Sequence, residues 1–179
     1  MYQVDLHDAS GLGYPLAVLG RTYAAQNCSA ARTLEAVGER WSLLIIRDAL
    51  FRGITRFTDF QRSLGVAPNI LTTRLDRFVG AGLMELRRHA GHPGLHEYVL
   101  TAKGRDLQPV IVALTAWGDA WAAPQGPPVL FEHEGCGGPV QQQVHCLRCG
   151  GVPIRGEVKA RPGPGRQPAT PVPGWRPPP

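Results

Sequence analysis

The stretch from Arg56 to Val79, RFTDFQRSLGVAPNILTTRLDRFV, constrains the fold most, because it predicts two short helices joined by a tight turn. In residues 57–64, apolar side chains follow the three- and four-residue spacing of one helical face. Gly65 favours the end of that helix, since glycine readily adopts the left-handed conformation found there. Pro68 suits the first turn of the next helix. The pattern is that of a helix-turn-helix.

The second of these helices separates apolar from polar side chains. Its inward-facing residues are expected to be Leu71, Leu75, Phe78 and Val79. The remaining faces carry Asn69, Thr72, Thr73, Arg74, Asp76 and Arg77. A buried stripe backed by amide, hydroxyl and guanidinium groups suits a helix that packs on a core and reads a DNA groove. It also fits an ordinary amphipathic helix, so this stretch alone leaves both interpretations open.

Length and composition favour one domain with appendages. The chain has 179 residues, of which 43% are hydrophobic, enough to form a core. No apolar run approaches the ~20 residues of a membrane span, and the N-terminus lacks the basic and apolar regions of a secretory signal. We therefore expect a soluble cytoplasmic protein without a membrane partner, and a nucleoid-associated one if it binds bacterial DNA.

Positive charge is concentrated in two segments. Residues 40–105 contain 11 Lys and Arg against 5 Asp and Glu, and residues 155–179 contain 5 against 1. The formal net charge of the whole chain is only +5, so the flanks of the central segment are acidic. This asymmetry favours a polyanionic partner at the centre of the chain.

Two further helices are expected before the helix-turn-helix. Residues 1–22 contain scattered glycine and proline and predict a flexible arm. A helix should begin at Cys28 or Ser29, capped by Asn27 or Ser29, with Leu34 and Val37 facing inward, and end at Gly38. The next helix, within residues 40–53, has almost no polar side and should lie at the centre of the core.

A β-hairpin should follow the helix pair. Residues 83–88 and 96–101 alternate like strands, and residues 91–94 have the composition of a turn. A hairpin in this position is the wing of a winged helix. Its tip is rich in hydrogen-bond donors that could meet phosphate, namely Arg87, Arg88, His89 and His92. The alternative is a solvated hairpin end without a ligand.

Beyond the hairpin, Thr101 should cap a helix that continues to about Trp121, with a kink or restart at Pro109. Trp117 and Trp121 lie one turn apart, which is more apolar surface than a small core requires. Either a dimer seam or a satellite of the core would explain them.

The segment 129–154 predicts a separate zinc-ribbon-like unit after a Pro/Gly linker. Two ligand pairs with the same spacing, His133 with Cys136 and Cys146 with Cys149, could offer four tetrahedral ligands to structural zinc. His145 is the rival nitrogen ligand, although it adjoins Cys146. A CxxC redox pair and a metal-free unit are the alternatives. The Pro/Arg-rich tail, 155–179, should be disordered.

Several separate signatures resemble the HxlR-type winged helix-turn-helix regulators of bacteria and archaea, relatives of the MarR group. They are Cys28 before the first helix, GERW, RFTDFQRSL, LTTRL, the GL pair, YVLTAKG and the closing WG, all in order between Tyr23 and Trp121. The resemblance covers the predicted domain, 23–122, which is more than half of the chain.

The resemblance implies a homodimer on a pseudo-palindromic operator in double-stranded DNA. The helix 69–79 would enter the major groove, the wing would reach the backbone or minor groove, and the first helix and the helix 103–121 would form the dimer. Members of the family often act as repressors. Several sense oxidants or electrophiles through the cysteine that corresponds to Cys28, and a helix N-terminus would favour its reactive thiolate. An inert buried cysteine is the alternative.

The resulting prediction is an α+β, mainly α fold, a winged helix-turn-helix domain with a C-terminal zinc-ribbon-like appendix. Its predicted function is DNA-binding transcriptional regulation, possible effectors being a small molecule or an oxidant. Predicted DNA-binding residues are Arg56, Asn69, Thr72, Thr73, Arg74, Arg77, Arg88 and His92. The alternatives are a protein-docking winged helix and a zinc- or thiol-dependent enzyme. The sequence offers no nucleophile–base pair, so we predict that the protein is not an enzyme.

Overall fold

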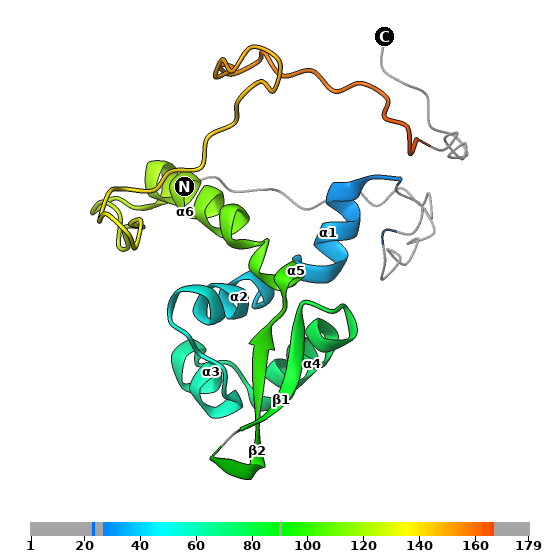
Figure 1. Cartoon of the computed structure of the whole chain (residues 1–179), viewed down its shortest axis with the longest axis vertical. Coiled ribbons are helices and arrows are strands. Elements are labelled where there is room, and N and C mark those ends of the chain that lie inside the picture. Colours follow the sequence, from blue (N-terminus) through cyan, green and yellow to red (C-terminus); the bar gives the residue numbers. More distant parts are fainter. Residues whose placement is uncertain (1–22, 24–26, 90, 167–179) are drawn as a thin grey trace, which may run out of the picture.

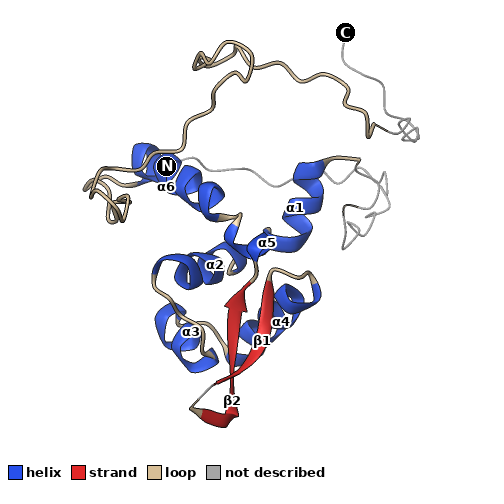
Figure 2. Ribbon diagram, viewed as in Figure 1, coloured by secondary structure: helices blue, strands red, loops and turns tan. Residues whose placement is uncertain are grey.

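The computed structural model describes Tyr23 and residues 27–89 and 91–166. The predicted arm 1–22 and the part of the tail in 167–179 lie outside the described residues. In order, the elements are α1 (Ser29–Val37), α2 (Ser42–Phe51), α3 (Phe57–Leu64), α4 (Pro68–Gly80), β1 (Met84–His89), β2 (His92–Leu100), α5 (Ala102–Arg105) and α6 (Gln108–Ala122). Figure 2 shows helices around one small hairpin, so the predicted mainly helical winged fold is confirmed.

The helix-turn-helix has the predicted boundaries because its special residues act locally. Gly65 ends α3 in the left-handed conformation, with φ of 61°, and its N–H donates to the carbonyl of Gln61 at 2.9 Å. Pro68 occupies the first turn of α4, where a missing N–H costs nothing. Val79, expected to face inward, is instead 38% exposed, because Leu71, Leu75 and Phe78 already fill the buried stripe.

The core surrounds α2, as expected. Its buried hydrophobic residues come from every helix except α5, from both strands and from the connections before α4 and β1: Val37, Ile45, Ile46, Phe60, Val66, Leu71, Leu75, Phe78, Leu83, Met84, Leu100, Ile111 and Val112. Leu34 of α1, expected to pack inward, is 49% exposed. Only the last residue of α1, Val37, is buried, because most of this helix extends away from the core.

A buried carboxylate joins α2 to α3. Asp48 is 0% exposed, and its Oδ1 accepts hydrogen bonds from Nε and Nη2 of Arg47 at 2.9 and 2.7 Å. Its Oδ2 accepts a 2.5 Å bond from the hydroxyl of Ser63, which also accepts a 2.6 Å bond from Arg52. These bonds supply the partners that a buried charge needs. The network therefore holds the first helix of the helix-turn-helix against the central helix.

The hairpin pairs β1 with β2 in an antiparallel register from Met84↔Leu100 to His89↔His92. The prediction of a turn at residues 91–94 was wrong in its extent, because β2 already begins at His92 and a register irregularity falls between Arg88 and His89. At the base of the hairpin, Tyr98 N–H donates to Thr55 O at 2.7 Å. This bond attaches the wing to the segment just before α3.

The last helical segment restarts where proline predicts it. α5 ends at Arg105, and α6 begins at Gln108 with Pro109 in its first turn. Thr101 caps α5 as predicted, accepting from Gly104 N–H at 3.2 Å and donating to Gly82 O at 2.7 Å. A Cβ on Gly104 would lie 2.1 Å from Leu83 O, so only glycine permits this close approach.

The tip of the hairpin and the helices α1 and α6 lie at opposite ends of the molecule (Figure 1). α3, α4 and the tip of the hairpin share one end, whereas α1 and α6 extend from the other. Within the described residues, no helix combines the length and apolar character needed to span a membrane. After α6 the described chain has no helix, and its only ladder pairing is the isolated bridge Glu132↔Pro139.

Candidate nucleic-acid interface

The exposed face of α4 presents short polar side chains. Asn69, Thr72 and Thr73 are all exposed on the first half of the helix, opposite the buried stripe. The hydroxyl of Thr72 donates to Pro68 O at 3.0 Å, and that of Thr73 to Asn69 O at 2.8 Å. Because these protons are already engaged, both threonines offer lone pairs and methyl groups outward. The Asn69 amide can both donate and accept, as base edges require.

The structure places Arg74 differently from its predicted neighbours on α4. Its side chain is 15% exposed, and its Nη2 lies 2.9 Å from Oε2 of Glu39, in the turn before α2. Arg77 is more exposed and reaches the same carboxylate at 3.8 Å. Glu39 thus engages Arg74 and holds the N-terminal side of α2 near α4. A base or phosphate contact by Arg74 would require this pair to open, and that contact stays a prediction.

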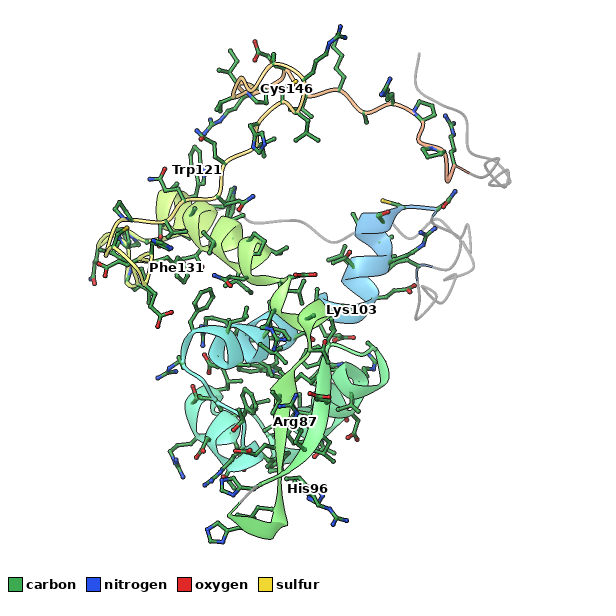
Figure 3. All side chains as sticks on the ribbon, in the orientation of Figure 1. Arg87, His96, Lys103, Trp121, Phe131 and Cys146 are labelled. Atoms are coloured by element: carbon green, nitrogen blue, oxygen red, sulfur yellow. The ribbon has the colours of Figure 1, made fainter. Side chains whose placement is uncertain are left out.

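On the wing, β1 carries two successive arginines with different surroundings. Arg87 forms an ion pair with Glu85 on the same strand. Arg88 is exposed and has no ion pair among the residues the structure describes. Arg88 pairs across the hairpin with His96, which Figure 3 labels. Arg88 is therefore the wing arginine whose charge remains available to phosphate.

Another predicted residue, Arg56, connects α3 to the wing. Its Nη2 lies 2.6 Å from Nε2 of His89, and its Nε is 4.0 Å from Glu97 Oε1. The hydroxyl of Thr55 donates to the same Glu97 oxygen at 3.0 Å. The cluster fixes the wing relative to the start of α3, so that both can meet one DNA duplex together.

Two further contacts position the wing. The predicted residue His92 is exposed, and its ring stacks on that of His89 with centroids 5.5 Å apart. At the base of the hairpin, burial raises the pKa of Tyr98, and the negative charge of Asp76 on α4 raises it further. Both effects favour the neutral phenol of Tyr98.

Cys28 is itself the N-cap residue of α1, a position that we predicted for Asn27 or Ser29. It is exposed rather than buried. The backbone N–H groups of Ala31 and then Ala30, at the start of α1, lower the pKa of the thiol, with a smaller contribution from Arg32. The geometry thus favours the thiolate at an accessible position.

An apolar stripe runs along the outer face of α6. Ile111 and Val112 are buried against the core. The stripe comprises Val110, Leu114, Trp117 and Trp121, which are 43%, 49%, 64% and 65% exposed. Their spacing of four, three and four residues is that of a coiled-coil seam. α6 therefore has a second apolar face that the described residues leave largely exposed, although the Arg155 guanidinium lies 5.8 Å from the centroid of the Trp121 ring.

The four predicted zinc ligands form two separate pairs. His133 Nδ1 lies 3.3 Å from Cys136 Sγ. The N–H groups of Cys149 and then Arg148 lower the pKa of the Cys146 thiol, and the Cys149 side chain lowers it further. Within the described part of the chain, no three His, Cys, Asp or Glu side chains are grouped closely enough to hold a metal ion. Zinc binding stays a prediction.

Sequence reasoning missed three acidic residues that organise the interface. Glu39 binds Arg74, Asp48 lies buried beneath α3, and Glu97 joins the wing to Thr55. Asp48 carries one signal, since a lone carboxylate in an otherwise apolar helix predicts a buried partner. Glu39 and Glu97 have no comparable signal, because each meets residues that are distant in the sequence.

Comparison with known proteins identifies similar regulators. The HxlR-like helix-turn-helix family matches residues 36–126. Over 151 residues the chain is 40% identical to an uncharacterised HTH-type transcriptional regulator, Rv3095, of Mycobacterium tuberculosis; the alignment covers 84% of this chain and 95% of that protein. An alignment of this length within 179 residues necessarily extends past the winged helix into the cysteine-containing segment.

Two solved structures support the same assignment. PA1607, a candidate transcription factor, is 39% identical with a TM-score of 0.68, covering 75% of this chain and 94% of that one. PA1374 of Pseudomonas aeruginosa, also a candidate transcription factor, is 42% identical with a TM-score of 0.55, covering 78% of this chain and 95% of that one. Both structures and the family match place the polar face of α4 in a helix-turn-helix domain.

Proposed function

Because this chain belongs to the HxlR-like helix-turn-helix family of DNA-binding transcriptional regulators, which are not enzymes, we propose that it is a homodimeric repressor of a pseudo-palindromic operator. One observation carries the proposal. The polar face of α4 and the wing lie at one end of the molecule, and the uncovered apolar stripe of α6 extends from the other (Figures 1 and 3). A dimer formed through α6 would leave both α4 helices free for DNA.

In this proposal α4 reads the major groove with Asn69, Thr72 and Thr73. All three lie on the first half of the helix, the part that contacts base edges in helix-turn-helix complexes. Arg88 and His92 on the wing, with Arg56 behind them and Arg77 on α4, contact phosphates and set the register. The two half-sites are then expected one helical turn, ~34–36 Å, apart.

Arg74 has a conditional role. Its guanidinium is bound to Glu39, which is about half exposed and therefore able to rotate toward solvent. The approach of a phosphate or a guanine would offer Arg74 a competing acceptor. Binding would then exchange one charged partner for another, so Arg74 contributes to the fit of α4 as well as to DNA contact.

The second copy of the chain is supported by the α6 stripe. Trp117 and Trp121 expose large apolar side chains, and such rings are enriched at protein interfaces. A stripe with coiled-coil spacing is self-complementary under two-fold symmetry, where the same patch serves both subunits. Leu34 on α1 is also exposed and extends the apolar surface available at this end.

Operator binding can be tested by titrating duplex DNA from the gene's own upstream region at several salt concentrations. Arg88→Ala should weaken binding to all sequences and lower the slope of log affinity against log salt by about 1, since one phosphate contact is lost. Asn69→Ala should instead reduce discrimination between operator and mutated operator by ~1–3 kcal/mol.

The charge-matched control is Arg161→Ala, which removes one positive charge from the segment after the winged helix. It should leave the sequence discrimination unchanged. If no salt-sensitive binding to the upstream DNA occurs, and the Arg88 and Asn69 variants behave like the parent, the winged helix serves as a protein-docking module instead.

We also propose that Cys28 senses oxidants or electrophiles. It is exposed, and the helix N–H groups that lower its pKa stabilise the reactive thiolate. A modified sulfur would present a different size and charge to the N–H groups of Ala30 and Ala31 at the start of the helix. Modification would therefore disturb the start of α1, which belongs to the end of the molecule assigned to the dimer.

The test follows alkylation of Cys28 by mass spectrometry of its peptide as a function of pH. In the folded protein the rate profile should be displaced to lower pH than in the urea-denatured chain, because the folded state favours the thiolate and retains it as pH falls. Oxidant should also lower operator affinity of the parent but not of Cys28→Ser. Coincident profiles together with unchanged affinity would identify Cys28 as inert.

A further inference from the structure

Two loops in the segment after α6 share one backbone design. In the first, His133 N–H donates to Gly138 O at 2.8 Å, and Gly137 N–H donates to His133 O at 2.8 Å. In the second, Cys146 N–H donates to Gly151 O and Gly150 N–H donates to Cys146 O, both at 2.8 Å. We name these the first knuckle (133–138) and the second knuckle (146–151).

Glycine occupies two corresponding positions of each knuckle. Gly137 and Gly150 have φ of 68° and 71°, a left-handed conformation that other residues rarely adopt. At the next position, a Cβ on Gly138 would lie 3.3 Å from Cys136 Sγ, and one on Gly151 would lie 3.4 Å from Cys149 Sγ. Each sulfur therefore sits over a glycine that leaves room for it. The repeated design places one Cys sulfur at the same point of each knuckle.

The first knuckle already holds its ligand atoms at a suitable separation. His133 Nδ1 and Cys136 Sγ are 3.3 Å apart. For a tetrahedral ion with Zn–S of about 2.3 Å and Zn–N of about 2.0–2.1 Å, the same two atoms would be ~3.6 Å apart. A small adjustment would admit zinc between them. The second knuckle has the same backbone hydrogen bonds and places Cys149 Sγ over Gly151, as Cys136 Sγ lies over Gly138.

The two knuckles differ in their attachment to the winged helix. Residues flanking the first knuckle form a short hairpin, with Val140 N–H donating to Phe131 O at 2.8 Å. The Phe131 ring packs on Phe51 of α2, with centroids 4.6 Å apart. Figure 3 shows Phe131 beside the helical domain and Cys146 in a separate loop. The first knuckle is therefore anchored, whereas the second extends from it.

Apolar burial cannot hold the second knuckle. All residues from 141 to 150 are exposed, and Leu147 is 94% exposed. A loop of this size has no core, so a structural metal is the usual source of its folding energy. Residues 141–145 lie between the knuckles and have no regular secondary structure. They therefore do not prevent the second knuckle from approaching the first.

We propose that one Zn²⁺ joins the two knuckles, bound by His133, Cys136, Cys146 and Cys149. Three thiolates and one imidazole form a closed tetrahedral set, which is structural rather than catalytic. Binding releases the thiol protons to solvent and involves no electron transfer. Zinc then fastens the second knuckle to the first, and through Phe131 to α2. This proposal does not depend on repression or on the dimer.

The experiment uses the full chain purified under reducing conditions without chelator. Elemental analysis should find one zinc per chain, and the double variant Cys146→Ser/Cys149→Ser should lose it. Substitution by Co²⁺ should produce the thiolate-to-metal charge-transfer absorption of a tetrahedral site. His133→Ala should weaken zinc affinity markedly. The matched control His145→Ala should retain zinc, because His145 precedes the second knuckle and is not one of the four proposed ligands.

A second readout separates metal loss from misfolding. Chelation of the parent should make residues 141–145 sensitive to protease while the helical circular dichroism of the winged helix persists. Full-length protein without stoichiometric zinc would overturn the proposal. A disulfide between Cys146 and Cys149 that forms on reoxidation of the reduced protein, with zinc present, would also overturn it. Zinc retained by the double cysteine variant would also overturn it.

Discussion

Replacing both Trp117 and Trp121 by glutamate should convert the protein to a monomer and remove tight operator binding. These rings are the most exposed members of the α6 stripe, and carboxylates there would meet each other at a two-fold seam. A monomer engages one half-site only. Because linking two half-sites raises affinity by ~10²–10⁴-fold, the variant should lose operator affinity by a factor of that order.

Light scattering after gel filtration measures the oligomeric state, and the DNA titration measures the affinity. Gln108→Glu adds a carboxylate to the same helix outside the stripe, so it should change neither quantity. Circular dichroism should show that the double variant remains folded, since both tryptophans lie outside the core. A folded, dimeric double variant would show that the dimer forms elsewhere.

Replacing Asp48 by alanine should lower the free energy of unfolding by ~2–4 kcal/mol, because hydrogen bonds to a buried charged group contribute about 1.5–3 kcal/mol each and are not fully additive. The variant loses the acceptor of Arg47 and of Ser63 and leaves a cavity between α2 and α3. Urea denaturation followed by circular dichroism gives the change.

The matched control is Asp59→Ala on α3, which removes a solvent-accessible ion pair with Arg62 at 2.9 Å. Exposed pairs contribute only ~0–1 kcal/mol, so this variant should remain close to the parent. Equal losses from both substitutions would show that the buried position of Asp48 has no special effect.

The helices and the hairpin could be predicted because their causes are local. Gly65 and Pro68 separate α3 from α4 through their own backbone preferences, and Pro109 restarts α6 for the same reason. Strand alternation predicted the hairpin, but not the start of β2 at His92, since composition alone indicated a turn there. A register irregularity depends on cross-strand pairing, which periodicity does not encode.

The candidate interface was predicted in part. The polar face of α4 follows from helical spacing, and the structure leaves Asn69, Thr72 and Thr73 exposed. Spacing could not show that Arg74 turns toward Glu39, because both are polar and the position of Arg74 on the helix borders the buried stripe. Spacing likewise could not show that Arg87 pairs with Glu85 while the charge of Arg88 remains available to phosphate, because this depends on which carboxylates lie near each arginine in the fold.

By itself, the sequence determined where helices begin and end, which family the chain resembles and which residue types could contact DNA or zinc, because these depend on local backbone preferences and on side-chain chemistry. Only the tertiary structure decided which charges are already engaged. It showed Asp48 buried under α3, Glu39 bound to Arg74 and Glu97 joined to Thr55. Those outcomes require distant segments to meet, and a pairing between distant residues has no periodic signal along the chain.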